Sequence, residues 1–209
     1  MIMNSQFYSL EPKKREQIIN AAIEEFARSG YERASTNEII KKAQISKGSL
    51  FNYFNNKKEL YLFLLQNVIE VIEKKLGEID LNERDFFKRV GEIGLIKFQI
   101  YSTYPQAFFF LKSAADEMSA EVKSEIDKAG KNFIGRSFEK IYDNVDMTKF
   151  RDDIDIKKAM DIINWTALGF AEEKRNTVAS FKDVDTDFLR EWDDYMEILQ
   201  SCFYKREGR

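Results

Sequence analysis

Small polar and basic side chains gather between residues 35 and 57, where three predicted helices begin one after another. The set comprises Ser35, Thr36, Asn37, Lys47, Gly48, Ser49, Phe51, Asn52, Tyr53 and Lys57. Hydroxyl, amide and ammonium groups donate hydrogen bonds to phosphate oxygens, and an amide such as that of Asn52 can also read a base edge. Gly48 leaves a helix start without a side chain, so another molecule could approach it closely. These residue types are therefore suited to binding a polyanion.

The composition excludes several kinds of catalytic site. The chain has no His, so it can form neither a Ser-His-Asp relay nor an imidazole metal site. Its one Cys, Cys202, allows no intrachain disulfide and no thiolate zinc cluster, and we expect it to be packed and unreactive. The acidic pairs Asp152-Asp153 and Glu172-Glu173 are adjacent in sequence, so their side chains point in different directions on a helix. We therefore expect no enzyme, no cofactor and no metal site.

Charge is distributed unevenly along the chain. Residues 1–65 contain ten Lys or Arg and seven Asp or Glu, whereas the remainder contains 23 basic and 29 acidic residues. A basic N-terminal third on an acidic body favours contact of that third with a nucleic acid. The first eight residues lack the basic and apolar regions of a signal peptide, and no apolar run is long enough to span a membrane. We expect a cytoplasmic protein without a membrane partner.

The hydrophobic periodicity predicts an all-α fold of about nine helices. The expected ranges are 12–29, 35–43, 47–53, 56–71, 83–103, 106–115, 119–142, 155–178 and 185–205. Pro12 suits the first turn of a helix, and Gly30 suits a helix end. Ser35 and Glu38 have the spacing of a capping box. Apolar and polar residues do not alternate for long enough anywhere to predict a strand.

The short helices 35–43 and 47–53, joined by a three-residue turn, predict a helix-turn-helix. In this arrangement the second helix enters the major groove of DNA with its first residues toward the bases. Five apolar side chains are expected to hold the two helices together: Ile39, Ala43, Ile45, Leu50 and Phe54. The basic charge of the region agrees with this interpretation.

The residue pattern over 13–65 resembles the DNA-binding domain of the TetR/AcrR family of transcriptional regulators. The matching stretches are Arg15–Ala22, Phe26, Gly30-Tyr31, Ala43–Phe54, Lys57 and Glu59-Leu60. The resemblance implies a helix-turn-helix domain over residues 1–60 and a helical ligand-binding and dimerisation domain over 61–209. Gln44 departs from the pattern because it replaces a small turn residue, often Gly. Phe51 departs as well, because it replaces a frequent Tyr.

The resemblance also implies roles for individual residues. Phosphate contacts would come from Ser35, Thr36, Ser49, Tyr53 and Lys57, and base contacts from Asn37, Lys47, Gly48, Phe51 and Asn52. A homodimer formed through the last two helices would present two recognition helices to double-stranded DNA with a palindromic operator. The implied function is that of a regulator, expected to be a repressor whose operator binding is relieved by a small molecule.

Aromatic residues in the body suggest a pocket for an apolar or aromatic effector. The candidate ligand-binding residues are Tyr101, Tyr104, Phe108, Asn164, Trp165 and Leu168. Ordinary helix packing is the competing explanation for most of them. The alternative function is that of a helical small-molecule-binding or adaptor protein that does not act through DNA. The sequence leaves open the identity of the effector, the operator sequence and whether the ligand releases or promotes DNA binding.

Overall fold

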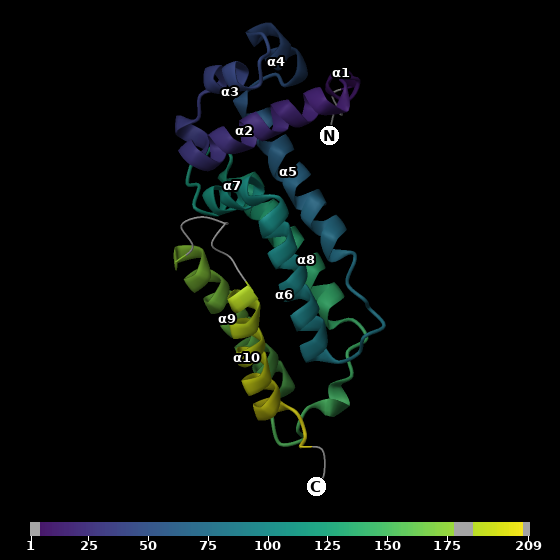
Figure 1. The fold of residues 1–209 in the computed structure, drawn as a ribbon. Helices are drawn as coiled ribbons and strands as arrows, with labels where there is room; N and C mark the ends of the chain where they lie inside the picture. Colours follow the sequence, from purple (N-terminus) through teal and green to yellow (C-terminus); the bar gives the residue numbers. More distant parts are fainter. Residues whose placement is uncertain (1–4, 178–185, 207–209) are drawn as a thin grey trace. The chain divides into compact units, whose positions relative to one another are not determined.

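The computed structural model describes residues 5–177 and 186–206, and within them the chain forms ten α-helices and no strand (Figure 1). The helices are α1 (Ser5–Tyr8), α2 (Pro12–Arg33), α3 (Thr36–Lys42), α4 (Lys47–Tyr53), α5 (Lys57–Leu76), α6 (Phe86–Thr103), α7 (Pro105–Ala115), α8 (Lys123–Tyr142), α9 (Ile156–Thr177) and α10 (Thr186–Phe203), with a 3-10 turn at Met147–Lys149. The all-α prediction is confirmed. The hydrophobic periodicity predicted about nine helices, and α1 was not among them.

Local signals in the sequence account for several helix ends. Pro12 occupies the first turn of α2, and Gly30 interrupts that helix with a positive φ of 70°. The chain kinks there and completes one more turn to Arg33, beyond the predicted end at residue 29. The Ser35 side chain accepts a hydrogen bond from the Glu38 N–H, as the predicted cap requires. None of the helices that the structure describes is long and apolar enough to cross a bilayer.

The chain forms two compact units, and neither is a continuous segment. The first contains the residues up to Lys74 and returns for Tyr104–Arg136, while the second contains Lys75–Thr103 and the described residues from Ser137 onward. The predicted boundary between residues 60 and 61 falls inside α5, which runs without interruption from Lys57 to Leu76. The compact unit around α3 and α4 is therefore larger than the segment over which a DNA-binding domain was predicted.

Aromatic rings fill the centre of the first unit. The rings of Phe26, Tyr31 and Phe110 surround Tyr61, with centroids 5.0 to 5.3 Å from that of Tyr61. These rings join α2, α5 and α7, and all four residues are at least 98% buried. Burial raises the pKa of both Tyr31 and Tyr61 above the usual range. Among the residues that the structure describes, the buried Tyr61 hydroxyl has no hydrogen-bond partner.

The second unit has its own apolar cluster. Its buried members are Phe86, Phe87, Val90, Val145, Phe150, Ala159, Ile163, Phe170, Trp192, Met196 and Tyr204. One charged side chain, Arg89, is fully buried beside this cluster and donates to the main-chain oxygens of Leu81, Glu83 and Asp143. Because a buried guanidinium needs acceptors, these contacts fix the loop before α6 to the segment after α8.

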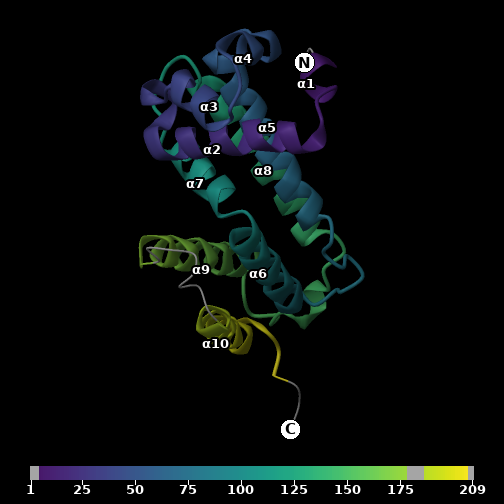
Figure 2. The ribbon, with the colours of Figure 1, turned by 45° about the horizontal axis from the view of Figure 1, so that its top comes forward.

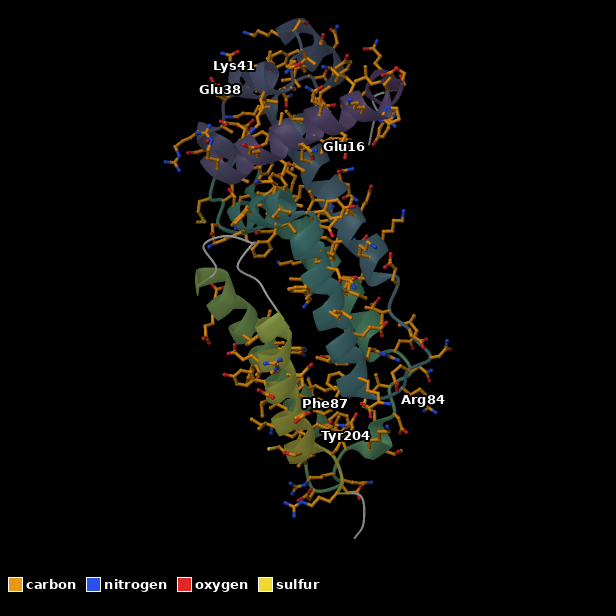
Figure 3. The ribbon with its side chains drawn as sticks, in the orientation of Figure 1. Glu16, Glu38, Lys41, Arg84, Phe87 and Tyr204 are labelled. Atoms are coloured by element: carbon orange, nitrogen blue, oxygen red, sulfur yellow. The ribbon has the colours of Figure 1, made fainter. Side chains whose placement is uncertain are left out.

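Asp85 fastens the start of α6 to the end of the chain. Its carboxylate lies 2.7 Å from Lys149 Nζ, accepts from the Lys88 N–H at 3.1 Å and lies 3.3 Å from the Tyr204 hydroxyl. Burial alone would raise the pKa of Asp85, but these donors outweigh burial and lower it. Phe87 and Tyr204 pack edge to face with centroids 4.9 Å apart, and Figure 3 shows them at the same end of the second unit.

Candidate nucleic-acid interface

Helices α3 and α4 form the predicted helix-turn-helix. Ile39, Ala43, Leu50 and Phe54 are at least 97% buried, and Ile45 packs on the same cluster while partly exposed. This confirms the five apolar residues that the sequence analysis assigned to the contact between the two helices. In both Figure 1 and Figure 2, α3 and α4 lie beside α2 at one end of the first unit.

The turn between the two helices depends on Gln44 and Lys14. Gln44 adopts a φ of 51°, in the left-handed region that favours glycine, and its side chain is exposed. Lys14 of α2 donates from Nζ to the main-chain oxygens of Ala43 and Gln44, each at 3.1 Å. A cation at the end of a helix is also favourable for the helix dipole. Lys14 was not among the predicted site residues, although it lies in the basic N-terminal segment.

The start of α4 is an exposed polar surface. Ser46 caps the helix by accepting the Ser49 N–H at 3.0 Å, and the two hydroxyl oxygens lie 2.8 Å apart. Lys47, Gly48 and Asn52 are exposed. A Cβ at Gly48 would meet only the Ser46 Oγ, at 3.8 Å. Packing inside the chain therefore does not require glycine at residue 48.

The remaining predicted contact residues lie on or near the same surface. Asn37 is exposed, while Ser35, Thr36, Ser49, Phe51 and Tyr53 are partly exposed. The Tyr53 ring packs against Phe7 of α1, with centroids 5.9 Å apart. This packing holds the ring and is compatible with either a structural role or a phosphate contact through the hydroxyl.

Lys57 is engaged within the protein. Its Nζ donates to the main-chain oxygen of Glu32 at 2.9 Å, lies 3.5 Å from that of Ala34 and stands 4.8 Å from the centroid of the Tyr31 ring. These contacts tie the start of α5 to the end of α2. An ammonium group has three N–H donors, so one remains for a further acceptor.

Glu25 anchors the start of α3 from inside α2. The side chain is 7% exposed and accepts the Ser35 N–H at 3.0 Å, with Ser29 Oγ at 3.3 Å and Arg28 as further donors. Burial would raise the pKa of Glu25, but these donors outweigh it and lower the pKa. Glu25 was not among the predicted site residues, because a single Glu on a helix rich in charge carries no distinguishing pattern.

The candidate ligand-binding residues divide between the two units. Tyr104 and Phe108 belong to the first unit, whereas Tyr101, Asn164, Trp165 and Leu168 belong to the second. The Tyr101 side chain lies outside the described part of the structure. Asn164 donates from Nδ2 to the Tyr142 hydroxyl. A ligand pocket formed by these residues therefore stays a prediction.

Large apolar side chains are exposed on α9 and α10. The exposed fractions are 40% for Ile162, 68% for Trp165, 65% for Leu168, 41% for Tyr195 and 60% for Ile198. Cys202 is exposed too, contrary to the expectation that it is packed, because it lies one helical turn beyond Ile198 on the same outward face. Exposed apolar side chains in such number on neighbouring elements are typical of an interaction surface.

Comparison with known proteins identifies the segment around α3 and α4. Residues 18–63 match the family model described as bacterial regulatory proteins, tetR family. The chain is 27% identical over 125 residues to the HTH-type transcriptional regulator RutR of Escherichia coli O157:H7, which covers 55% of this chain and 58% of RutR. The chain thus matches little more than half the length of this curated relative.

Solved structures share the fold over nearly the whole chain. A TetR family transcriptional regulator from Chloroflexus aurantiacus aligns with a TM-score of 0.69 and 21% identity, covering 97% of this chain and 98% of that one. FadR from Bacillus subtilis, crystallised in complex with stearoyl-CoA, aligns with a TM-score of 0.59 and 19% identity over 89% of this chain and 97% of FadR. At these identities the likeness concerns the fold.

Proposed function

The chain belongs to the TetR family of bacterial regulatory proteins, and from that premise we propose that it is a DNA-binding transcriptional regulator. We propose further that it acts as a repressor whose operator binding is relieved by a small, mostly apolar effector. The observation that carries the proposal is the exposed start of α4, which Ser46 caps. Gly48 lies there, and the packing of the protein itself leaves room for a larger residue at this position. A regulator of this kind works in the cytoplasm, where bacterial DNA lies.

In the proposed complex, α4 enters the major groove with its first residues toward the bases. Lys47, Phe51 and Asn52 meet base edges, and Asn37 reaches a base from α3. Ser35, Thr36, Ser49 and Tyr53 bind phosphate oxygens, and Lys57 adds its remaining N–H. The absent side chain at Gly48 permits the close approach of the helix to the DNA. Electrostatic attraction to phosphate supplies most of the affinity, so binding weakens steeply as salt is raised.

A homodimer through α9 and α10 follows from the same proposal. The exposed apolar side chains of these helices support it, and Trp165 and Leu168 serve the subunit contact better than a pocket because they are about two-thirds exposed in the single chain. A two-fold dimer presents two α4 helices to a palindromic operator. An effector that binds one dimer conformation better than the other then shifts the affinity for DNA by that difference.

Fluorescence anisotropy with labelled DNA from upstream of the protein's own gene tests the DNA-binding function. We expect binding whose affinity falls with salt on a log–log plot. Gly48→Ala should weaken binding roughly tenfold or more while the free energy of unfolding stays equal or rises, because Ala favours a helix. Lys128→Ala, which removes an exposed lysine of α8, is the matched control and should change little.

Two outcomes would count against parts of the proposal. Absence of salt-dependent binding to any promoter DNA would leave the alternative of a ligand-binding or adaptor protein that does not act through DNA. For Lys57→Ala, loss of a phosphate contact should reduce the salt slope by about one. An unchanged slope together with a lower melting temperature would assign Lys57 to the fold alone, through its contacts with α2.

A further inference from the structure

Helix α1 packs against the end of α4, the helix proposed to enter the major groove. The side chain of Phe7 in α1 is 1% exposed. Its ring centroid lies 5.9 Å from that of Tyr53, the last residue of α4. The centroids of Phe54 and of Phe63, which belongs to α5, lie 5.1 and 5.3 Å from it. In both Figure 1 and Figure 2, α1 and α4 lie at the same end of the first unit. Phe7 therefore links the end of α4 to α5.

Contacts from outside α1 hold this short helix in place. A helix of four residues has too few hydrogen bonds to be stable by itself. Arg15 of α2 donates from Nη1 to the main-chain oxygen of Tyr8. Ser9 Oγ donates to the main-chain oxygen of Gln6 at 2.8 Å, which closes the turn after the helix. The position of Phe7 is thus set both by its own burial and by the hydrogen bond from α2.

Tyr53 carries a hydroxyl that the fold does not use. Within the described ranges, this hydroxyl makes no hydrogen bond, and the Phe7 ring is the one aromatic ring in contact with the Tyr53 ring. The Tyr53 side chain is partly exposed. A partly exposed tyrosine can sample more than one staggered rotamer, and a buried ring packed against it at an interplanar angle of 61° restricts that freedom. Phe7 therefore limits the directions in which the Tyr53 hydroxyl can point.

We propose that Phe7 of α1 is a positioning residue for DNA binding, which holds the Tyr53 hydroxyl where it meets a phosphate oxygen. Phe7 is buried, so it acts through Tyr53 and does not touch DNA. A side chain that is fixed before binding loses less conformational entropy when the complex forms. The inference rests on the proposed function and adds to it a residue outside the helix-turn-helix. Ordinary packing of Phe7 is the competing explanation.

A double-mutant cycle on the full chain tests the inference with the promoter DNA and the anisotropy measurement of the proposed function. Tyr53→Phe keeps the ring and removes the hydroxyl, so the dissociation constant should rise about tenfold. Phe7→Ala releases the Tyr53 side chain, so the dissociation constant should rise about threefold to tenfold. In the Tyr53→Phe background, Phe7→Ala should raise it by less than about twofold, because no hydroxyl is left to position.

Stability has to be measured beside affinity, because Phe7 also belongs to the apolar cluster of the first unit. Phe7→Ala should lower the melting temperature by a similar amount in both backgrounds. The affinities are compared at a temperature where circular dichroism shows every variant folded. If Phe7→Ala does not fold, Phe7→Leu takes its place in the cycle, since it keeps most of the apolar volume but lacks the flat ring. Its coupling to Tyr53→Phe should have the same sign and a smaller size.

Phe63→Leu is the matched control. The Phe63 ring packs against those of Phe7 and Phe54, at 5.3 and 5.1 Å, and within the described ranges it has no ring contact with Tyr53. This substitution should lower the melting temperature while changing the affinity for DNA by less than about twofold. The slope of affinity against salt should stay the same in every variant of the cycle, because the Tyr53 hydroxyl carries no charge.

The outcomes separate this inference from the proposed function. Equal effects of Phe7→Ala in the two backgrounds, or a loss of affinity in Phe63→Leu as large as that in Phe7→Ala, would overturn the positioning role and leave Phe7 as a packing residue. Unchanged DNA affinity in Tyr53→Phe would overturn it too, because there would be no contact to position. In each case, salt-dependent binding by the original protein would still support the regulator. An original protein that binds no promoter DNA would contradict the proposed function and the positioning role together.

Discussion

Gln44 holds a backbone conformation for which its side chain is poorly suited. Its φ of 51° costs a residue with a Cβ about 1 kcal/mol relative to glycine. The two hydrogen bonds from Lys14 to the oxygens of Ala43 and Gln44 help to keep the turn in this conformation. The family that this chain resembles often has Gly at this position, which agrees with backbone strain at Gln44. The side chain that helps to hold the strained turn is Lys14.

Gln44→Gly should raise the free energy of unfolding by roughly 0.5 to 1 kcal/mol, because glycine adopts a positive φ without the clash of a Cβ. Urea denaturation followed by circular dichroism measures the change. Asn144 has a similar φ of 57°, but asparagine tolerates this region, so Asn144→Gly is a control that should change the free energy less. Equal effects of the two substitutions would remove strain at Gln44 as the explanation.

At the scale of helices, α6 and α10 meet so closely at Gly94 that a methyl group does not fit. A Cβ there would lie 2.7 Å from Trp192 Nε1 and 3.1 Å from Cδ1. Gly94→Ala should therefore destabilise the second unit by about 1 to 3 kcal/mol. Gly91→Ala, on the same helix, would meet nothing within 4 Å and should be neutral or stabilising by up to about 1 kcal/mol. Thermal denaturation of the pair checks the prediction, and similar melting temperatures would contradict it.

Because the Asp85 carboxylate holds the start of α6 in place, the stability of the second unit should depend on pH. The pKa of Asp85 is lower in the folded chain than in the unfolded one, so its contribution to stability is complete above the unfolded pKa of about 4. The contribution is lost as the pH falls through the folded pKa. At neutral pH, Asp85→Asn should lower the free energy of unfolding by about 1 to 3 kcal/mol.

Urea denaturation over a series of pH values provides the measurement for Asp85. The difference between the original protein and Asp85→Asn should shrink on the acid side, since protonation removes the same charge that the substitution removes. Asp152→Asn, which alters an exposed carboxylate paired with Lys205, is a control that should have a smaller effect at every pH. A difference that stays constant down to acid pH would exclude the Asp85 charge as its cause.

At the scale of the whole molecule, the exposed apolar side chains of α9 and α10 predict association of two copies. Trp165→Glu combined with Ile198→Glu should convert a dimer to a monomer in sedimentation equilibrium, with the helical content unchanged. The charges would be buried without partners in the subunit contact. Met118→Glu replaces a side chain that is 77% exposed in the first unit and should leave the dimer intact. A monomeric original protein would contradict the prediction directly.

Local patterns in the sequence were sufficient to predict the helix-turn-helix but not the wider site. Ser35, Ile39 and Leu50 act within a few residues of chain, so capping and hydrophobic spacing identified them. Lys14 and Glu25 act across 29 and 10 residues, and only the packing of α2 on α3 brings them to their partners.

The first unit is built from two separate segments of the chain, and this has a consequence for protein synthesis. Its apolar cluster includes Phe110, Ala114, Val122 and Ile126 from α7 and α8, together with residues from α1 to α5. When only the first five helices have left the ribosome, they expose an apolar surface whose covering segments have not yet emerged. Nascent chains arrested when residue 76 has just left the exit tunnel should be cut readily by protease, whereas chains arrested after residue 136 has left the tunnel should resist it.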